Sequence, residues 1–283
     1  MIFLPSYGPN ITKANHLLST TKPSSKISES TVHSFYYAEF DQNKGSNSGV
    51  VIDDACYELM FVKEKNVKLI NGGSQSFLLP PSYTLNNLEG PFKFDYDDSF
   101  SSFCIKLQPW MNASYIPTKK SQLLDLNQLY PQFVDPLHKN LFASASFEEM
   151  VEHAEEFLLS INVAPNKEVE LIRKVCLLIY QESGNITVGE IADQFNIYRQ
   201  RLSALFKQEV KYTIKKFINC IRIRACLAYK LINPEISLTE IGHRYGFYDQ
   251  AHFIRSFKQA CGITPSEYVK TPGYSLEHLQ SKK

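Results

Sequence analysis

One short pattern occurs twice in the last third of this 283-residue chain, and it constrains the fold more than any other feature. Residues 191–198 (IADQFNIY) correspond to residues 241–248 (IGHRYGFY) at an offset of 50. Further on, Leu205-Phe206-Lys207 returns as Ser256-Phe257-Lys258 at an offset of 51. A repeat at this spacing predicts two copies of one small supersecondary unit.

Each copy carries the start and turn signals of a pair of helices. The segments Thr187–Glu190 and Ser237–Glu240 are capping boxes, in which the hydroxyl and the carboxylate satisfy backbone N–H groups at a helix start. Asn196 and Gly246 then occupy the same place, and both residue types tolerate the positive φ that a tight turn requires. The pattern predicts helix-turn-helix units over about 187–208 and 237–261.

A single long helix is predicted between the two copies. Apolar residues from Ile214 to Ile232 advance by three or four positions until Asn233-Pro234 ends the pattern. This predicts a linker helix over about 213–232. A further cap at Thr264-Pro265-Ser266-Glu267 predicts a last short helix.

The charge is divided unevenly along the chain although the net charge is only +1. Residues 1–184 carry 15 Lys and Arg against 21 Asp and Glu, whereas residues 185–270 carry 13 against 7. Such an asymmetry is typical of a nucleic-acid-binding module attached to a neutral or acidic one. A solvated helical surface would give the same count, so charge alone leaves both interpretations open.

The first half of the chain has the pattern of a β-rich domain. Short runs of β-forming residues alternate with turn signals from Phe35 to about Leu107. This spacing predicts a small barrel or sandwich. The predicted strands are 49–53, 58–62, 67–70, 76–79, 92–96 and 102–107.

Two amphipathic helices are predicted after the strands. The first covers 147–161 behind a capping box formed by Ser146 and Glu149, and its apolar stripe can pack within its own domain or against a second copy of the chain. The second covers about 167–181 and ends at Gly184. The water-facing side of the first helix is predicted to hold Glu148, Glu149, Glu152, Glu155 and Glu156.

These patterns predict a multidomain α+β protein. Residues 1–161 would form the β-rich sensing or dimerisation domain, 162–184 a helical connector and 185–283 an all-α DNA-binding domain. The six cysteines lack metal-ligand spacing and are predicted to be free thiols. No apolar run approaches ~18 residues, and the first residues lack a signal-peptide pattern, which predicts a cytoplasmic protein that does not enter a membrane.

Residues 236–270 resemble the AraC/XylS family of bacterial transcription factors. The segment ISLTEIGHRYGFYDQAHFIRSFKQACGITPSEYVK follows the family pattern almost position for position. The first unit is looser, because Lys211 and Ile214 stand where the family usually has Gly and often has Pro. The N-terminal half is weakly similar to the family's cupin-like sensing domains, through residues 50–61 and 103–109.

The resemblance implies a sequence-specific transcriptional regulator that reads two successive major-groove segments with two recognition helices. It implies neither catalysis nor a cofactor. No H-x-H cluster joins His16, His33 and His138, so no metal site is predicted. Two alternatives from other classes stay open: a cysteine-dependent acceptor of alkyl groups from DNA, and a helical interaction module that does not bind DNA.

The resemblance also implies which residues meet double-stranded DNA. Arg suits guanine, Gln suits adenine, and Ala or Ile can touch a thymine methyl. The expected base contacts are Arg199, Gln200, Ser203, Ala204, Gln250, Ala251, Ile254 and Arg255. The expected phosphate contacts are Arg201, Lys207, Lys211, Lys215, Lys216, Arg222, Arg224, Arg244, His252 and Lys258. RNA polymerase, a small-molecule effector and a second copy of the chain, bound through the N-terminal domain, are the further partners considered.

Overall fold

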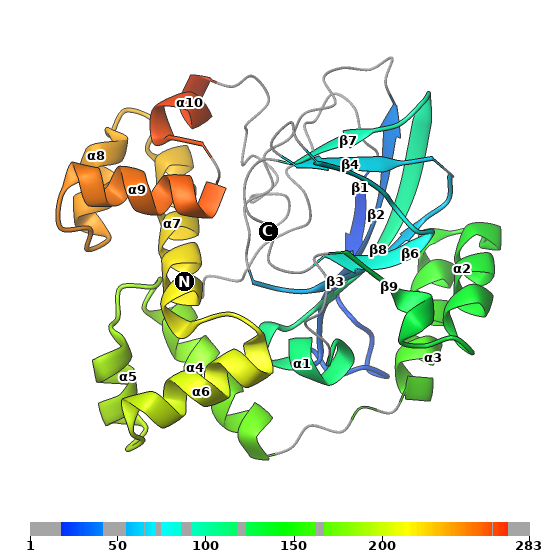
Figure 1. Ribbon diagram of the computed structural model, residues 1–283, viewed down its shortest axis with the longest axis horizontal. Helices are drawn as coiled ribbons and strands as arrows, with labels where there is room; N and C mark the ends of the chain where they lie inside the picture. Colours follow the sequence, from blue (N-terminus) through cyan, green and yellow to red (C-terminus); the bar gives the residue numbers. More distant parts are fainter. Residues whose placement is uncertain are drawn as a thin grey trace.

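The computed structural model joins a β-rich N-terminal part to a helical C-terminal part (Figure 1). It describes residues 18–41, 55–64, 66–71, 75–85, 92–117, 123–161, 163, 167–261 and 263–270. None of the helices within these ranges is long and apolar enough to cross a membrane. The predicted strand at 49–53 lies outside the described residues, whereas the other five predicted strands are confirmed.

The larger sheet has six antiparallel strands, and its centre is β8. On β8 every residue from Ser102 to Leu107 is buried, so both faces of the sheet are covered. Its edge strands are β1 and β9, and four of its strands (β1, β2, β6 and β9) were not among the predicted ones. In spatial order the strands are β1 (Leu18–Thr21), β2 (Val32–Asp41), β8 (Ser99–Leu107), β3 (Glu58–Val62), β6 (Ser82–Leu85) and β9 (Leu123–Asp125).

A three-stranded antiparallel sheet lies against one face of the larger sheet. It is formed by β5 (Gln75–Leu78), β4 (Lys68–Asn71) and β7 (Phe92–Asp95) in that order. Apolar residues of both sheets, such as Leu69 and Cys104, form one cluster between them. Among the described strands no pairing joins the two sheets, so this part is two packed sheets rather than the closed barrel that was one of the two predicted arrangements.

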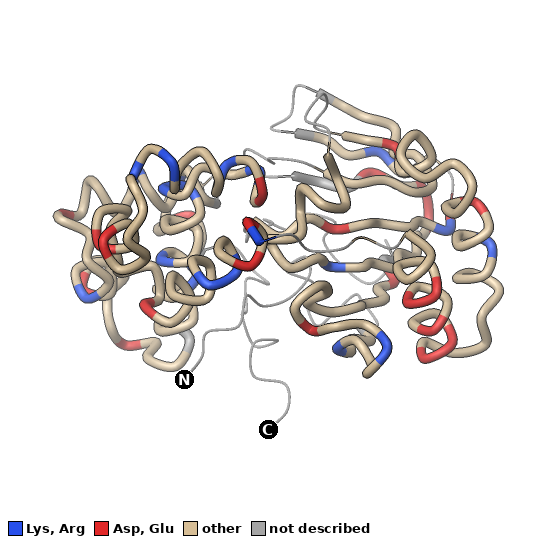
Figure 2. The backbone as a smooth tube through the Cα atoms, turned by 90° about the horizontal axis from the view of Figure 1, so that it is seen from below, with Lys and Arg blue, Asp and Glu red and all other residues tan. Residues whose placement is uncertain are grey.

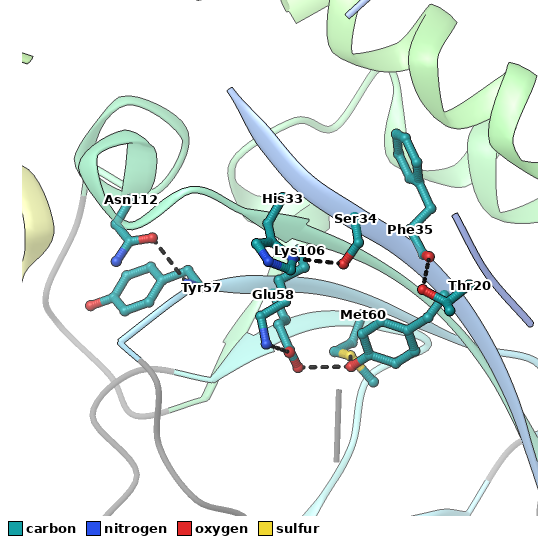
Figure 3. A network of polar contacts seen from close by, with 10 residues as sticks. Thr20, His33, Ser34, Phe35, Tyr57, Glu58, Met60, Lys106 and Asn112 are labelled. Carbon is teal, nitrogen blue, oxygen red and sulfur yellow. Dashed lines mark hydrogen bonds and ion pairs between the residues drawn. The ribbon is translucent and has the colours of Figure 1, made fainter. Parts of the chain in front are cut away.

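The cluster between the sheets also holds charged and hydroxyl groups. Lys106 is almost fully buried, and its Nζ lies 3.4 Å from Oε1 of Glu58 (Figure 3). The hydroxyl of Tyr36 donates to the other carboxylate oxygen of Glu58 at 2.9 Å. Buried charges are stable only when they are paired and hydrogen-bonded in this way.

Helices cover the opposite face of the six-stranded sheet. The apolar stripe of α3 (Phe147–Ile161) packs there within its own domain, together with α2 (Val134–Ala143). Most residues of this stripe, which could also have formed a dimer contact, are therefore already buried. The prediction that Glu155 faces water is wrong, because its carboxylate is buried and accepts from the backbone N–H and hydroxyl of Ser24 at 2.7 and 2.6 Å.

The apolar core on this side of the sheet, called the main core below, continues into the helical part. It contains Phe35 and Phe103 from the sheet, Ile172 from α4 (Lys167–Gln181), and Phe206 and Phe217 from the C-terminal helices. The predicted division at 184/185 therefore does not coincide with a break in packing. Domain limits at 161 and 184 stay a prediction.

The helical part follows the predicted sequence of elements closely. Thr187 accepts from Glu190 N–H and forms the full capping box. Thr213 caps the long helix in the same way, through Lys216 N–H. The elements are α5 (Val188–Gln194), α6 (Arg199–Val210), α7 (Ile214–Ile232), α8 (Leu238–Arg244), α9 (Gln250–Cys261) and α10 (Pro265–Lys270).

The long helix α7 belongs to two cores. Its N-terminal half, including Phe217 and Ile221, lies in the main core with α5 and α6. Its C-terminal half, including Ile223 and Leu227, lies in a separate C-terminal core with α8, α9 and α10. One continuous helix thus fixes both helix pairs relative to each other.

Asn112 connects the N-terminal part to the end of α6. Asn112 is the first residue of the short helix α1 (Asn112–Tyr115), and its side chain is fully buried. Its Nδ2 donates to the carbonyl oxygens of Ala55 and Val210 at 2.8 and 2.9 Å, while its Oδ1 accepts from the N–H of Tyr57 at 3.0 Å (Figure 3). The three hydrogen bonds thus join residues 55–57 to the end of α6.

Replacing Asn112 by Ala should destabilise the protein, because it removes three buried hydrogen bonds at once. We expect the free energy of unfolding, measured by urea denaturation, to fall by about 3 kcal/mol. The control is Asn140→Ala on the exposed side of α2, which should change stability by less than about 0.5 kcal/mol. Equal stability of the two variants would show that Asn112 does not hold these segments together.

Candidate nucleic-acid interface

The second helix of each pair presents one apolar and one polar face. On α6, Leu202, Leu205 and Phe206 point into the main core. The residues between them, expected to contact bases, face outward: Arg199, Gln200 and Ala204 are exposed and Ser203 is half-buried, with Arg201 and Lys207 exposed beside them.

The second pair repeats this arrangement on α9. Phe253 and Phe257 lie in the C-terminal core, with ring centroids 5.7 Å apart. The outward face again matches the expected base-contact set. Gln250, Ala251, Ile254 and Arg255 are exposed, and they are flanked by the exposed Lys258 and the half-buried His252.

Small residues and positive φ angles set the angle between the helices of each pair. Asn196 and Gly246 have φ values of 48° and 76°, as predicted for the two turns. Ala192 and Gly242 are both buried where the helices cross. A methyl group on Gly242 would lie 2.9 Å from Cγ of Phe253, so the second pair crosses more closely than a side chain permits.

One expected base contact is turned toward the first helix of its pair. The guanidinium of Arg199 lies over Gly189 of α5. The two are so close that a methyl group added to Gly189 would lie 2.6 Å from Nη2 of Arg199. The side chain is long and exposed, so other rotamers that point away from α5 are open to it.

The basic residues expected at phosphates fall into exposed and packed groups. Lys215 is exposed at the start of α7, while Lys216 lies 4.7 Å from the ring centroid of Tyr212. Lys211 adopts a φ of 66°, and its Nζ donates to the carbonyl oxygen of Pro117 at 3.3 Å. Figure 2 shows that Lys and Arg are spread over several helices of this part.

The four arginines of this set differ strongly in exposure. Arg244 is exposed and stacks on Tyr229, with Cζ 4.6 Å from the ring centroid. Arg222 is half-buried: its Nε donates to the carbonyl oxygen of Gly184 at 2.8 Å, and burial lowers the pKa of its guanidinium. Arg224 is buried within the helical part. Arg201 and Arg244 thus face solvent, whereas Arg222 and Arg224 are packed.

Two exposed tyrosines at the interface were absent from the expected set. Tyr198 immediately precedes α6, and Tyr248 occupies the corresponding place in the second pair. The repeat itself aligns them, so the sequence carried the signal needed to find them.

Five cysteines of the described part of the chain carry thiol groups outside any disulfide, and they lie mainly in the interior. Cys104, Cys176, Cys220 and Cys226 are buried, and Cys56 is half-buried. Burial raises the pKa of the Cys226 thiol to about 12 and that of Cys176 well above its ordinary value. A nucleophilic cysteine needs the opposite shift. Within the described ranges, no group of three or more His, Cys, Asp or Glu could hold a metal ion.

Comparison with known proteins matches residues 191–271 to a helix-turn-helix domain. The Msm operon regulatory protein of Streptococcus mutans is 27% identical over 152 residues, which are 53% of this chain and 54% of that protein. The transcriptional activator NphR of Rhodococcus is 23% identical over 235 residues, which are 76% of this chain and 70% of that one. The match thus spans about half the length of the first of these relatives.

Among solved structures, ToxT from Vibrio cholerae is similar in 91% of this chain and 98% of its own, with 16% identity and a TM-score of 0.42.

Replacing Gly242 by Ala should disturb the second helix pair, because the added methyl group meets the buried ring of Phe253. We expect a loss of about 1 to 3 kcal/mol in unfolding free energy, measured by denaturation. Gly189→Ala is the matched control, since its methyl group meets only the mobile end of Arg199 and Ala favours a helix. If both substitutions are tolerated equally, the close crossing of α8 and α9 is wrong.

Proposed function

We propose that this chain, whose C-terminal part is a helix-turn-helix domain of the AraC/XylS family, is a sequence-specific DNA-binding transcriptional regulator. The two relatives named above are a regulatory protein and a transcriptional activator. Since the match covers only about half of the first relative, the activity of the whole protein is part of the proposal.

The observation that carries this proposal is the pair of matched outward faces on α6 and α9. Each face belongs to the second helix of a pair, and both pairs are joined by the single helix α7. We therefore assign both pairs as helix-turn-helix units. Two recognition helices on one face of a duplex enter successive major-groove segments about one helical turn, ~34 Å, apart.

We assign base reading to the exposed side chains that can distinguish bases. Gln200 and Gln250 can each take adenine through N6 and N7, and Arg255 can take guanine through O6 and N7. Ala204, Ala251 and Ile254 offer apolar contacts to thymine methyl groups. The exposed Lys207, Lys215, Lys258 and Arg201 are assigned to phosphates.

The N-terminal part is proposed to sense a small molecule between its two sheets. The supporting observation is the hydroxyl of Tyr83, which is fully buried and makes no hydrogen bond within the described part of the chain. Burial raises the pKa of the phenol, and the neighbouring Cys104 and Glu58 raise it further, so the hydroxyl stays protonated. A protonated phenol is a donor for a ligand oxygen.

The remaining proposals concern organisation and partners. We keep 1–161, 162–184 and 185–283 as functional divisions, the last of them binding DNA in the cytoplasm without catalysis. A homodimer would have to use a surface other than the apolar stripe of α3, which is buried. Contact with RNA polymerase follows only from the proposed role in transcription. The raised thiol pKa values of Cys176 and Cys226 disfavour the DNA-alkyl acceptor.

Binding of the full chain to duplex DNA tests the proposed function directly. Phosphate contacts release counterions, so log K should fall linearly with log salt, with a slope of about 0.9 per phosphate neutralised. Fluorescence anisotropy with labelled duplexes at several salt concentrations measures this slope. A folded protein that fails to bind any duplex at low salt would eliminate the proposal and leave the non-DNA interaction module.

A second experiment separates base readers from phosphate positioners. A preferred site is first selected from random duplexes with the full chain. Arg255→Ala should then weaken that site by roughly 1 to 3 kcal/mol and relax base preference in one half of it. The control Lys215→Ala should weaken all duplexes similarly and reduce the salt slope by about 0.9. An unchanged site preference in Arg255→Ala would contradict the placement of α9.

A further inference from the structure

The aligned octapeptides of the repeat are identical at only two positions, and the structure explains only one of them. The first is Ile191 and Ile241, which are fully buried in their respective cores. The second is Tyr198 and Tyr248, whose side chains are 87% and 88% exposed. Packing accounts for the shared isoleucine, whereas no packing accounts for the shared tyrosine.

Neither tyrosine serves the fold through its side chain. Tyr198 takes the N-cap position of α6 in an extended conformation, and its side chain makes no capping hydrogen bond. The start of α9 is capped by Asp249, whose carboxylate accepts from the N–H of His252 at 2.6 Å, so Tyr248 is not needed there either. Two large aromatic residues are thus exposed at equivalent sites without a structural task.

Their position points to one kind of partner. Each tyrosine lies at the N-terminal end of the second helix of its pair, next to exposed base-contact candidates: Arg199 and Gln200 in one pair and Gln250 in the other. In a helix-turn-helix complex this end of the helix enters the major groove first. A residue just before the helix then lies at the rim of the groove, where the sugar-phosphate backbone runs.

We propose that Tyr198 and Tyr248 are a matched pair of backbone contacts, in which each phenol hydroxyl donates to a DNA phosphate at the rim of its major-groove segment. This inference rests on the proposed function. Tyrosine is among the side chains that hydrogen-bond phosphate oxygens. Because both contacts come from the same place in the repeat, they would set the register of α6 and α9 in the same way.

A neutral hydroxyl differs from a lysine in one measurable respect. Lysine replaces condensed counterions when it meets a phosphate and therefore contributes to the salt dependence of binding. A phenol donates a hydrogen bond without releasing a cation. Its loss should lower the affinity while leaving the salt slope unchanged, and this combination separates a tyrosine contact from a charge contact.

The test uses the full chain with Tyr198→Phe, Tyr248→Phe and the double variant, which keep both rings and remove only the hydroxyls. We expect each single variant to weaken binding about fivefold, and the double variant about 25-fold, on selected and random duplexes alike. The salt slope should equal that of the wild type. Leu78→Ala, at an exposed apolar residue of β5, is the control and should bind like the wild type.

Three results would overturn the inference. Wild-type affinity of the double Phe variant would show that the hydroxyls do not meet phosphates and would leave the exposed rings to a protein partner. A change in the preferred sequence would make the tyrosines base readers, and a reduced salt slope would mean that charge contacts had been lost. If the wild type itself binds no duplex, the proposed function fails first, which distinguishes the two failures.

Discussion

The carboxamide of Asn112 joins parts of the chain that the sequence keeps far apart. It forms hydrogen bonds with Ala55 and Tyr57 beside the six-stranded sheet. It also donates to the carbonyl oxygen of Val210 at the end of α6, which lies 98 residues after Asn112 in the sequence. Around it the main core runs without a break from the sheet to α6 and α7. The helix α6 is therefore held by the N-terminal part and not only by its own helix pair.

This continuity limits how the N-terminal part can influence DNA binding. A shift of the sheet relative to α6 must either carry α6 along or break buried hydrogen bonds that cost several kcal/mol to leave unmade. A small molecule can bias such a shift only by binding the two arrangements with different affinity. The buried Lys106 and Tyr83 and the half-buried Glu58 lie between the sheets. The six-stranded sheet separates them from α6, so any effect must pass through its packing.

Features that depend on neighbouring residues were predictable, and features that depend on distant ones were not. The caps at Thr187 and Ser237, the positive φ at Asn196 and Gly246, and the outward face of α6 all follow from patterns a few residues long. Glu155 looked exposed by helical periodicity, yet its partner Ser24 lies 131 residues earlier. For the same reason, sequence patterns did not predict the hydrogen bonds of Asn112, the extension of the core past residue 184 or the packing of Arg222 and Arg224.

Arg222 shows how the two helix pairs are tied together. The sequence placed it at a phosphate, but its Nε donates to the carbonyl oxygen of Gly184 and its guanidinium lies 5.3 Å from the ring centroid of Phe247 in the second pair. The turn at Gly246 lies against the side-chain carboxamide of Asn185, the residue that follows Gly184. These contacts fix the spacing of α6 and α9. Under the proposed function, a duplex whose half-sites are spaced differently would have to deform to fit, at an energy that depends on its sequence.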